Sequence, residues 1–222
     1  KMLFLLPPAD LYPMGAAYVS AVFEKTGYHY DMLGFFYDNS AWYRKYSSVK
    51  SSIGKCNTDG FEFIESSKSM EFVFELFFKE NYDFVFTGGL VGFFRWFLSI
   101  LPQMKSLRPD CLFVIGGGIT KDLDENVLFE KLKVDFILKG EAETNLHIFL
   151  STIILNKNFK YSDLYEIPGI CWKNNAAAVK KITTQRFDLS SNHVLPLWES
   201  LPIQEYIRRS VSLFGGGRTF FP

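Results

Sequence analysis

The chain contains 222 residues, of which 48% are hydrophobic and 22% charged, and this is sufficient for one sizeable core. Its formal net charge of +0 gives no sign of a surface for nucleic acid, and no apolar run approaches the ~20 residues that span a membrane. The cysteines Cys56, Cys111 and Cys171 are few and widely separated, which argues against a disulfide framework or a local zinc site. We therefore expect a cytoplasmic protein with no nucleic-acid or membrane partner.

Strands and helices alternate along the first two thirds of the chain. Short apolar runs predict five buried strands, at Met2–Leu6 and at residues 28–36, 82–86, 111–115 and 134–138. Apolar residues at helical spacing predict helices at residues 16–25, 67–80, 93–106, from about 122, and 142–156. Residues 37–66 are polar with scattered aromatics and are interpreted as a long inserted connection. The alternation predicts a parallel sheet with right-handed crossovers.

One predicted helix is unusually rich in phenylalanine. In residues 67–80, the side chains of Phe72, Phe74, Phe77 and Phe78 are interpreted as a stripe facing the core. An aromatic cofactor box is the alternative for such a face.

Glycines follow four of the five predicted strands. Residues 111–120 read Cys-Leu-Phe-Val-Ile-Gly-Gly-Gly-Ile-Thr, and the other loops carry Gly15, Gly88-Gly89 and Gly140. The carboxyl ends of parallel strands share one edge of the sheet, where open α/β folds bind ligands, so these loops should converge. Glycines would let a flat or bulky ligand lie against bare backbone. A set of tight strand-to-helix turns is the alternative.

The chain changes character after about residue 160. Two short strands around Asn174-Asn175 predict a β-hairpin, and the chain from Arg186 onward is interpreted as an irregular linker toward another domain. The sequence thus predicts an α/β domain at 1–158, a hairpin extension at 159–185 and an extended linker at 186–222. The expected fold is a flavodoxin-like (Rossmann-like), doubly wound, five-stranded parallel sheet.

The motifs, taken in order, resemble the amino-terminal cobalamin-binding domain of cobalamin-dependent radical S-adenosylmethionine enzymes. They are Pro7-Pro8 with Pro13-Met14-Gly15, then Thr87-Gly88-Gly89, Val114-Ile115-Gly116-Gly117-Gly118, Lys139-Gly140-Glu141-Ala142-Glu143 and Ile167-Pro168-Gly169. In that family a following barrel domain holds a four-iron four-sulfur cluster on a Cys-x-x-x-Cys-x-x-Cys motif and cleaves S-adenosylmethionine. No such cysteine triplet occurs here, and the chain stops about where the family would enter the barrel. The resemblance implies methyl transfer or another radical rearrangement in the intact enzyme, with the barrel as partner domain.

The resemblance implies cobalamin as the cofactor and a set of residues around it, but no catalytic residue and no protein metal ligand. The implied cofactor-binding residues are Pro8, Tyr12, Pro13, Gly15, Thr87, Gly88, Gly89, Leu90, Gly116, Gly117, Gly118, Gly140, Glu141 and Glu143. If the glycines admit the nucleotide tail, Gly117→Leu should abolish cobalamin retention and leave the fold intact, unless the backbone there needs positive φ.

Three positions depart from the family pattern. Gly140-Glu141-Ala142-Glu143 replaces the usual Gly-Glu-Gly-Glu, and Gly118-Ile119 stands where the glycines are usually followed by Pro-His. Tyr12 occupies the frame in which cobalamin methyltransferases carry the histidine that binds cobalt. Two other functions remain open: a non-catalytic cobalamin-binding or sensory module, and a flavodoxin-like domain with another ligand or none.

Overall fold

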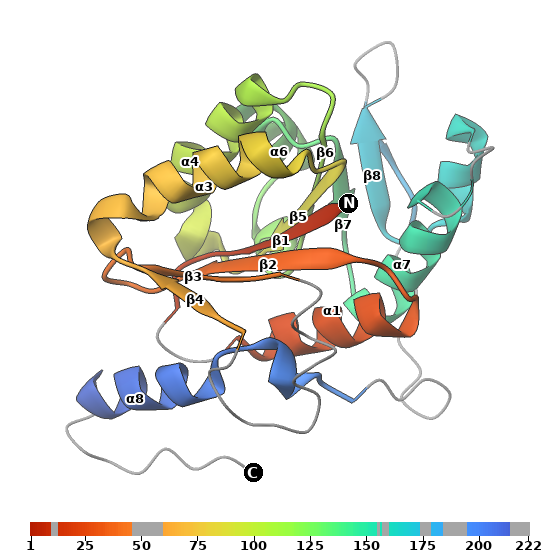
Figure 1. Cartoon of the computed structure of the whole chain (residues 1–222). Coiled ribbons are helices and arrows are strands. Elements are labelled where there is room, and N and C mark those ends of the chain that lie inside the picture. Colours follow the sequence, from red (N-terminus) through yellow and green to blue (C-terminus); the bar gives the residue numbers. More distant parts are fainter. Residues whose placement is uncertain are drawn as a thin grey trace.

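The computed structural model describes residues 1–9, 13–45, 60–154, 156, 160–173, 179–183 and 195–213. Within these residues a nine-stranded mixed sheet lies between two layers of helices (Figure 1). The strands are β1 Met2–Leu6, β2 Tyr30–Phe35, β3 Ala41–Arg44, β4 Glu62–Ile64, β5 Phe84–Gly88, β6 Leu112–Gly116, β7 Phe136–Leu138, β8 Ile170–Lys173 and β9 Val179–Lys181.

The centre of the sheet consists of five parallel strands in the order β2-β1-β5-β6-β7. These correspond to the five strands predicted from the sequence, and their order is that of flavodoxin-like folds. The prediction of a five-stranded, wholly parallel sheet is wrong, however. Strands β3 and β4 extend one side and β8 and β9 the other, all in antiparallel pairing.

The helices follow the predicted positions closely in the first two thirds of the chain. They are α1 Met14–Lys25, α3 Ser66–Glu80, η1 Val91–Phe93, α4 Phe94–Leu107, α5 Ile119–Asp122, α6 Glu125–Leu132, α7 Ala142–Phe149, η2 Leu150–Ile154, η3 Tyr161–Glu166, η4 Trp198–Ser200 and α8 Ile203–Leu213. Here η2 is a π-helical turn, and the other η elements are 3₁₀ turns.

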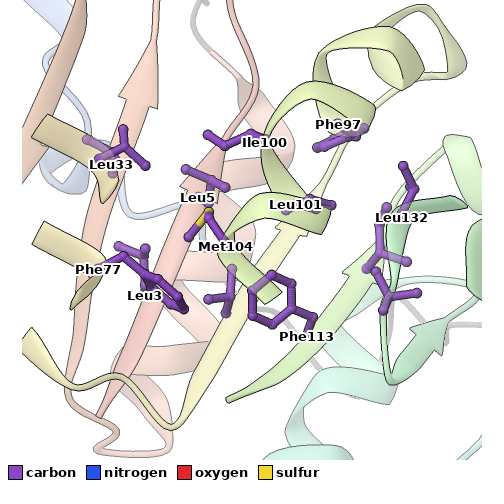
Figure 2. Close-up of a cluster of buried hydrophobic side chains, with 14 of the residues drawn as sticks. Leu3, Leu5, Leu33, Phe77, Phe97, Ile100, Leu101, Met104, Phe113 and Leu132 are labelled. Carbon is purple, nitrogen blue, oxygen red and sulfur yellow. The ribbon is translucent and has the colours of Figure 1, made fainter. Parts of the chain in front are cut away.

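Alternate side chains of each central strand enter two separate hydrophobic cores. On one face, Leu3 and Leu5 of β1 pack with side chains of α3, α4 and α6, among them Phe77, Leu101 and Leu132 (Figure 2). On the other face, the neighbouring side chains of β1 pack against α1 and α7. The sheet is therefore covered on both faces, as the doubly wound prediction requires.

The phenylalanine stripe of α3 is only partly as predicted. Phe77 is fully buried, but Phe78 is 69% exposed, and the buried face of the helix is completed by Val73 and Leu76. Residues 73, 76 and 77 lie on one side of a helix, whereas residue 78 is rotated by a further 100° toward solvent.

The carboxyl-terminal segment contains a helix where an irregular linker was predicted. Helix α8 follows Pro202 directly, and the segment before it runs along α1, where the Leu197 N–H donates to the Ala17 carbonyl at 3.0 Å. Tyr206 is buried, and its hydroxyl accepts a hydrogen bond from the Trp42 indole at 3.1 Å. A proline ahead of the first turn is compatible with a helix, because the first N–H groups have no intrahelical partner.

None of the helices in the described ranges has the length and apolar character needed to cross a membrane.

Candidate functional site

The loops that follow β1, β5, β6 and β7 meet at the carboxyl edge of the sheet and surround a cavity of about 770 Å³. This edge is a topological switch point, because the chain leaves β1 for α1 on one face and leaves β5 for α4 on the opposite face. Open α/β sheets bind ligands at such points. The cavity has the volume of an ordinary small-molecule site.

The structure brings most of the predicted site residues together around this cavity. Those that line it are Pro13, Gly15, Thr87, Gly88, Gly89, Leu90, Gly116, Gly117, Gly118, Gly140 and Glu141. Pro8 is buried but does not line the cavity, although Pro7 and Ala9 on either side of it do. Tyr12 and the side chain of Glu143 lie outside what the structure describes.

The floor of the cavity was not predicted from the sequence. Strand residues Phe4, Phe86 and Val114 reach it from the sheet, and Val19 of α1 and Leu146 of α7 close it from the helices. These residues belong to the core that α1 and α7 form with the sheet, so the cavity extends from the loops into the layer beneath them. The sequence signal for these floor residues was the apolar face of each helix. Such a face is equally typical of a helix that packs on a core without a cavity.

Several glycines of the rim are required by the fold itself. A Cβ on Gly88 would lie 2.7 Å from the Gly116 carbonyl oxygen, and a Cβ on Gly117 would lie 3.0 Å from the Gly89 nitrogen. Gly117 also has a φ of +80°, which side chains rarely adopt. The alternative interpretation, in which the glycines form tight strand-to-helix turns, therefore applies to Gly88 and Gly117. Gly117→Leu should consequently disturb the fold.

Two other glycines of the wall have room for a Cβ. Nothing lies within 4 Å of a Cβ built on Gly15, and the nearest atom to one on Gly116 is the Leu138 carbonyl oxygen at 3.4 Å. Gly15 is in the first turn of α1, where a side chain is sterically permitted. These positions make the backbone accessible to a ligand without a conformational requirement for glycine.

Few polar groups line the cavity. The Thr87 hydroxyl donates to the Leu5 carbonyl oxygen at 2.8 Å, so its proton is committed to the neighbouring strand and its oxygen is left as an acceptor. Glu141 is the one acidic side chain among the described lining residues, and none of them is Lys, Arg, His or Cys. The site therefore suits a ligand whose bulk is uncharged.

The mouth of the cavity carries large apolar side chains in contact with solvent. Met14 is 56% exposed, Tyr37 61% and Leu90 64%, and all three line the cavity. They come from α1, the loop after β2 and the loop after β5, so three separate elements contribute exposed apolar side chains to the cavity. Clustered exposed apolar side chains indicate a binding surface more often than isolated ones do.

The described cysteines do not contribute to the site. Cys111 and Cys171 are buried free thiols, and burial raises the pKa of Cys111 to about 12 and that of Cys171 to about 11. Both thiols are therefore protonated at neutral pH and poorly nucleophilic. In the part of the chain that the structure describes, no three His, Cys, Asp or Glu side chains come together in a metal-binding arrangement.

Comparison with known proteins places this chain by fold. No family model matches the sequence, and no curated protein matches it. Among solved structures, the cobalamin-dependent S-adenosylmethionine radical enzyme OxsB with aqua-cobalamin bound matches with a TM-score of 0.63 and 14% sequence identity. The same enzyme without cobalamin matches with a TM-score of 0.61 and 14% identity.

The extent of the match is unequal in the two proteins. It covers 94% of this chain but 25% of the cobalamin-bound OxsB chain, so this chain spans about a quarter of that enzyme's length. Nearly the whole of this chain thus has the fold of one part of a cobalamin-dependent radical S-adenosylmethionine enzyme.

Proposed function

We propose that this chain is a cobalamin-binding module of a radical S-adenosylmethionine enzyme, whose cluster domain lies in a part of the protein that this chain does not contain. The cavity at the carboxyl edge of the sheet is the observation that carries the proposal. It is ringed by glycine loops, floored by apolar side chains and surrounded by exposed apolar residues. The fold match to OxsB, a protein solved with cobalamin, supports this choice of ligand.

The cavity fits part of a cobalamin molecule rather than the whole. A corrin ring is broad and mostly uncharged, so it would lie across the mouth against Met14, Tyr37 and Leu90. The narrower part of the ligand would enter between the sheet and helices α1 and α7. Gly15 and Gly116, which have no side chain at the wall, allow this close approach.

The charge of the described lining favours cobalamin over a phosphate-terminated ligand such as a flavin nucleotide. Among the described lining residues a terminal phosphate would find no cationic side chain, and it would meet the carboxylate of Glu141 instead. The phosphate of cobalamin is instead a phosphodiester in the nucleotide tail. It carries a single negative charge, so it depends less on a cationic side chain than a terminal phosphate does.

When bound, cobalamin would supply methyl-transfer or other radical chemistry, and the residues of this chain would hold and shield it. Leu90 and Met14 would exclude water from the mouth. The apolar floor of the cavity, which includes Phe4 and Leu146, would determine how far the ligand enters. None of these residues needs to exchange a proton with the substrate.

The proposal is tested by cobalamin retention. The purified chain is mixed with aquacobalamin, freed of excess ligand by gel filtration, and examined for the corrin absorption bands. Retention is expected in the parent protein and in Gly92→Leu, because Gly92 is exposed, has open space around its Cβ position and does not line the cavity. Gly15→Leu places the same side chain on the wall and should lose retention.

Two results would contradict the proposal: a folded parent protein that retains no cobalamin, or equal retention by the two leucine variants. The association with a radical enzyme has its own test, the coding sequence beyond residue 222. We expect a Cys-x-x-x-Cys-x-x-Cys motif there, and its absence would leave a cobalamin module without the cluster domain.

A further inference from the structure

One polar side chain of the cavity wall has an unusual environment. Asn145 of α7 is 2% exposed and lines the cavity beside Leu146. Its side-chain Nδ2 donates to the carbonyl oxygen of Lys139, in the loop after β7. A carbonyl oxygen can only accept, so this contact fixes the orientation of the amide.

The other end of the same amide is left without a partner. The Oδ1 atom of Asn145 is buried and makes no hydrogen bond to any described residue. Buried acceptors are normally paired, because leaving one unpaired costs the free energy of its lost hydration. Of the polar side chains on the described wall, Thr87 has already committed its proton to the Leu5 carbonyl. The Asn145 acceptor thus has no donor among the described residues, and a bound ligand could supply one.

The position of Asn145 is itself held tightly. Gly169, with a φ of +73°, packs against both the Lys139 carbonyl and the Asn145 amide, and any Cβ at residue 169 would collide with them. The Gly169 carbonyl in turn accepts from the Lys139 N–H at 2.9 Å. These contacts hold the Asn145 amide against the loop after β7 and so fix the place of its Oδ1.

We propose that Asn145 is a specificity-determining residue of this site, whose Oδ1 accepts a hydrogen bond from an amide N–H or a hydroxyl of the bound ligand. The inference rests on the proposed function, since cobalamin offers both kinds of donor, carboxamides on the corrin and a hydroxyl on the nucleotide ribose. Because Oδ1 is covered by protein, the ligand's donor must displace the wall contact that covers it. The new hydrogen bond then forms away from water, where it discriminates strongly between ligands.

Two substitutions separate this role from the structural contact with Lys139. Asn145→Leu removes the acceptor and the amide donor together, whereas Asn145→Asp keeps an acceptor oxygen and loses the amide donor. Both should lower the melting temperature. The affinity for aquacobalamin should fall about tenfold in Asn145→Leu and by no more than about threefold in Asn145→Asp. His147→Leu, on the exposed side of the same helix, is the control and should bind as the parent does.

Repeating the titrations with cobinamide, which lacks the nucleotide, locates the donor. A tenfold loss for cobalamin alone assigns it to the nucleotide, and an equal loss for both ligands assigns it to a corrin carboxamide. Equal losses of cobalamin affinity in Asn145→Leu and Asn145→Asp would overturn the proposal and reduce Asn145 to a structural role, as would unchanged affinity in Asn145→Leu. Failure of the parent chain to bind cobalamin would be a different result, because it overturns the proposed function as well.

Discussion

Gly88 and Gly116 are paired side by side at the carboxyl ends of β5 and β6, so closely that a Cβ on Gly88 would meet the carbonyl oxygen of Gly116 at 2.7 Å. The next residues continue this contact, because the Ile119 N–H donates to the Gly89 carbonyl at 2.7 Å. The two glycine loops thus form one hydrogen-bonded unit beside the cavity. Such a unit can present backbone to a ligand without first having to be ordered.

The glycines of this unit should differ sharply in their tolerance of a methyl group. Gly117→Ala should lower the free energy of unfolding by about 1–2 kcal/mol, because Gly117 has a φ of +80° and its Cβ would crowd Gly89. Gly116→Ala, with only the Leu138 carbonyl at 3.4 Å, should change it by less than about 0.5 kcal/mol. Urea unfolding measures both values, and equal losses would contradict the left-handed backbone at residue 117.

A buried carboxylate at the opposite end of the sheet should be important for stability. Asp31 of β2 is 1% exposed and accepts hydrogen bonds from the Tyr82 hydroxyl at 2.7 Å and the Tyr43 hydroxyl at 3.0 Å. Burial, and then the charge of Asp31, raise the pKa of Tyr82, so its hydroxyl stays a donor at any ordinary pH.

Removing one of these donors leaves a buried charge less well solvated. Tyr82→Phe should cost about 1.5–3 kcal/mol of unfolding free energy, as expected for a hydrogen bond to a charged group. Tyr165→Phe removes a hydroxyl from a side chain that is 56% exposed and should be nearly neutral. Similar thermal and urea stabilities for the two variants would show that the Asp31 network is not stabilising.

The ion pair between Glu125 and Lys139 should make stability depend on pH. Their side chains approach to 2.6 Å, and the hydrogen bond from Lys139 holds the pKa of Glu125 below its ordinary value. A carboxylate with a depressed pKa in the folded state stabilises the protein above its unfolded pKa of ~4.3 and loses that contribution as the pH falls through the folded pKa. Glu125→Gln should therefore lower the melting temperature at pH 7, and the difference from the parent should vanish in acid.

The control for this experiment lies on the same helix. Glu130→Gln removes a carboxylate that is 64% exposed and 3.8 Å from Lys173, so its effect should be small at every pH. A melting-temperature difference for Glu125→Gln that persisted unchanged in acid would point to lost packing instead of the ion pair.

The coordination of cobalt offers a spectroscopic prediction. We expect cobalamin to bind with its own base displaced and without a protein nitrogen on the metal, because Tyr12 stands in the frame of the usual histidine and a phenol with an ordinary pKa near ~10 is a poor ligand. Electron paramagnetic resonance of the Co(II) form should lack threefold splitting from a coordinated nitrogen. Such splitting would refute the prediction, and Tyr12→Phe should leave the spectrum unchanged.

The parallel core was predictable because its strands are short, mainly apolar runs separated by helical patterns, whereas the added strands are not. Strand β3 lies in a polar stretch and can be recognised only from its pairing with β2. Helix α8 was not predicted because Pro196 and Pro202 are equally typical of an extended segment. The site was predictable at the strand ends, where glycines cluster. Its depth depends on how α1 and α7 cross the sheet, which local sequence does not specify.

Asn145 was not predicted as a site residue, although the sequence contains a signal for it. Ala142, Leu146 and Phe149 define the apolar face of α7, and Asn145 lies on that face as its one polar member. A single amide on a buried helical face often serves the core, however, and its unpaired oxygen becomes visible only once the loop after β7 and Gly169 are placed around it.

The outermost described strands, β4 and β9, are three residues long each, and β9 carries Lys180 and Lys181. Exposed strand edges are where sheets of different molecules merge, and short charged edges offer too few free backbone groups for that pairing. The antiparallel additions therefore act as terminators of the sheet. A module whose sheet ends in this way can lie against other domains, or against copies of itself, without forming a continuous sheet with them.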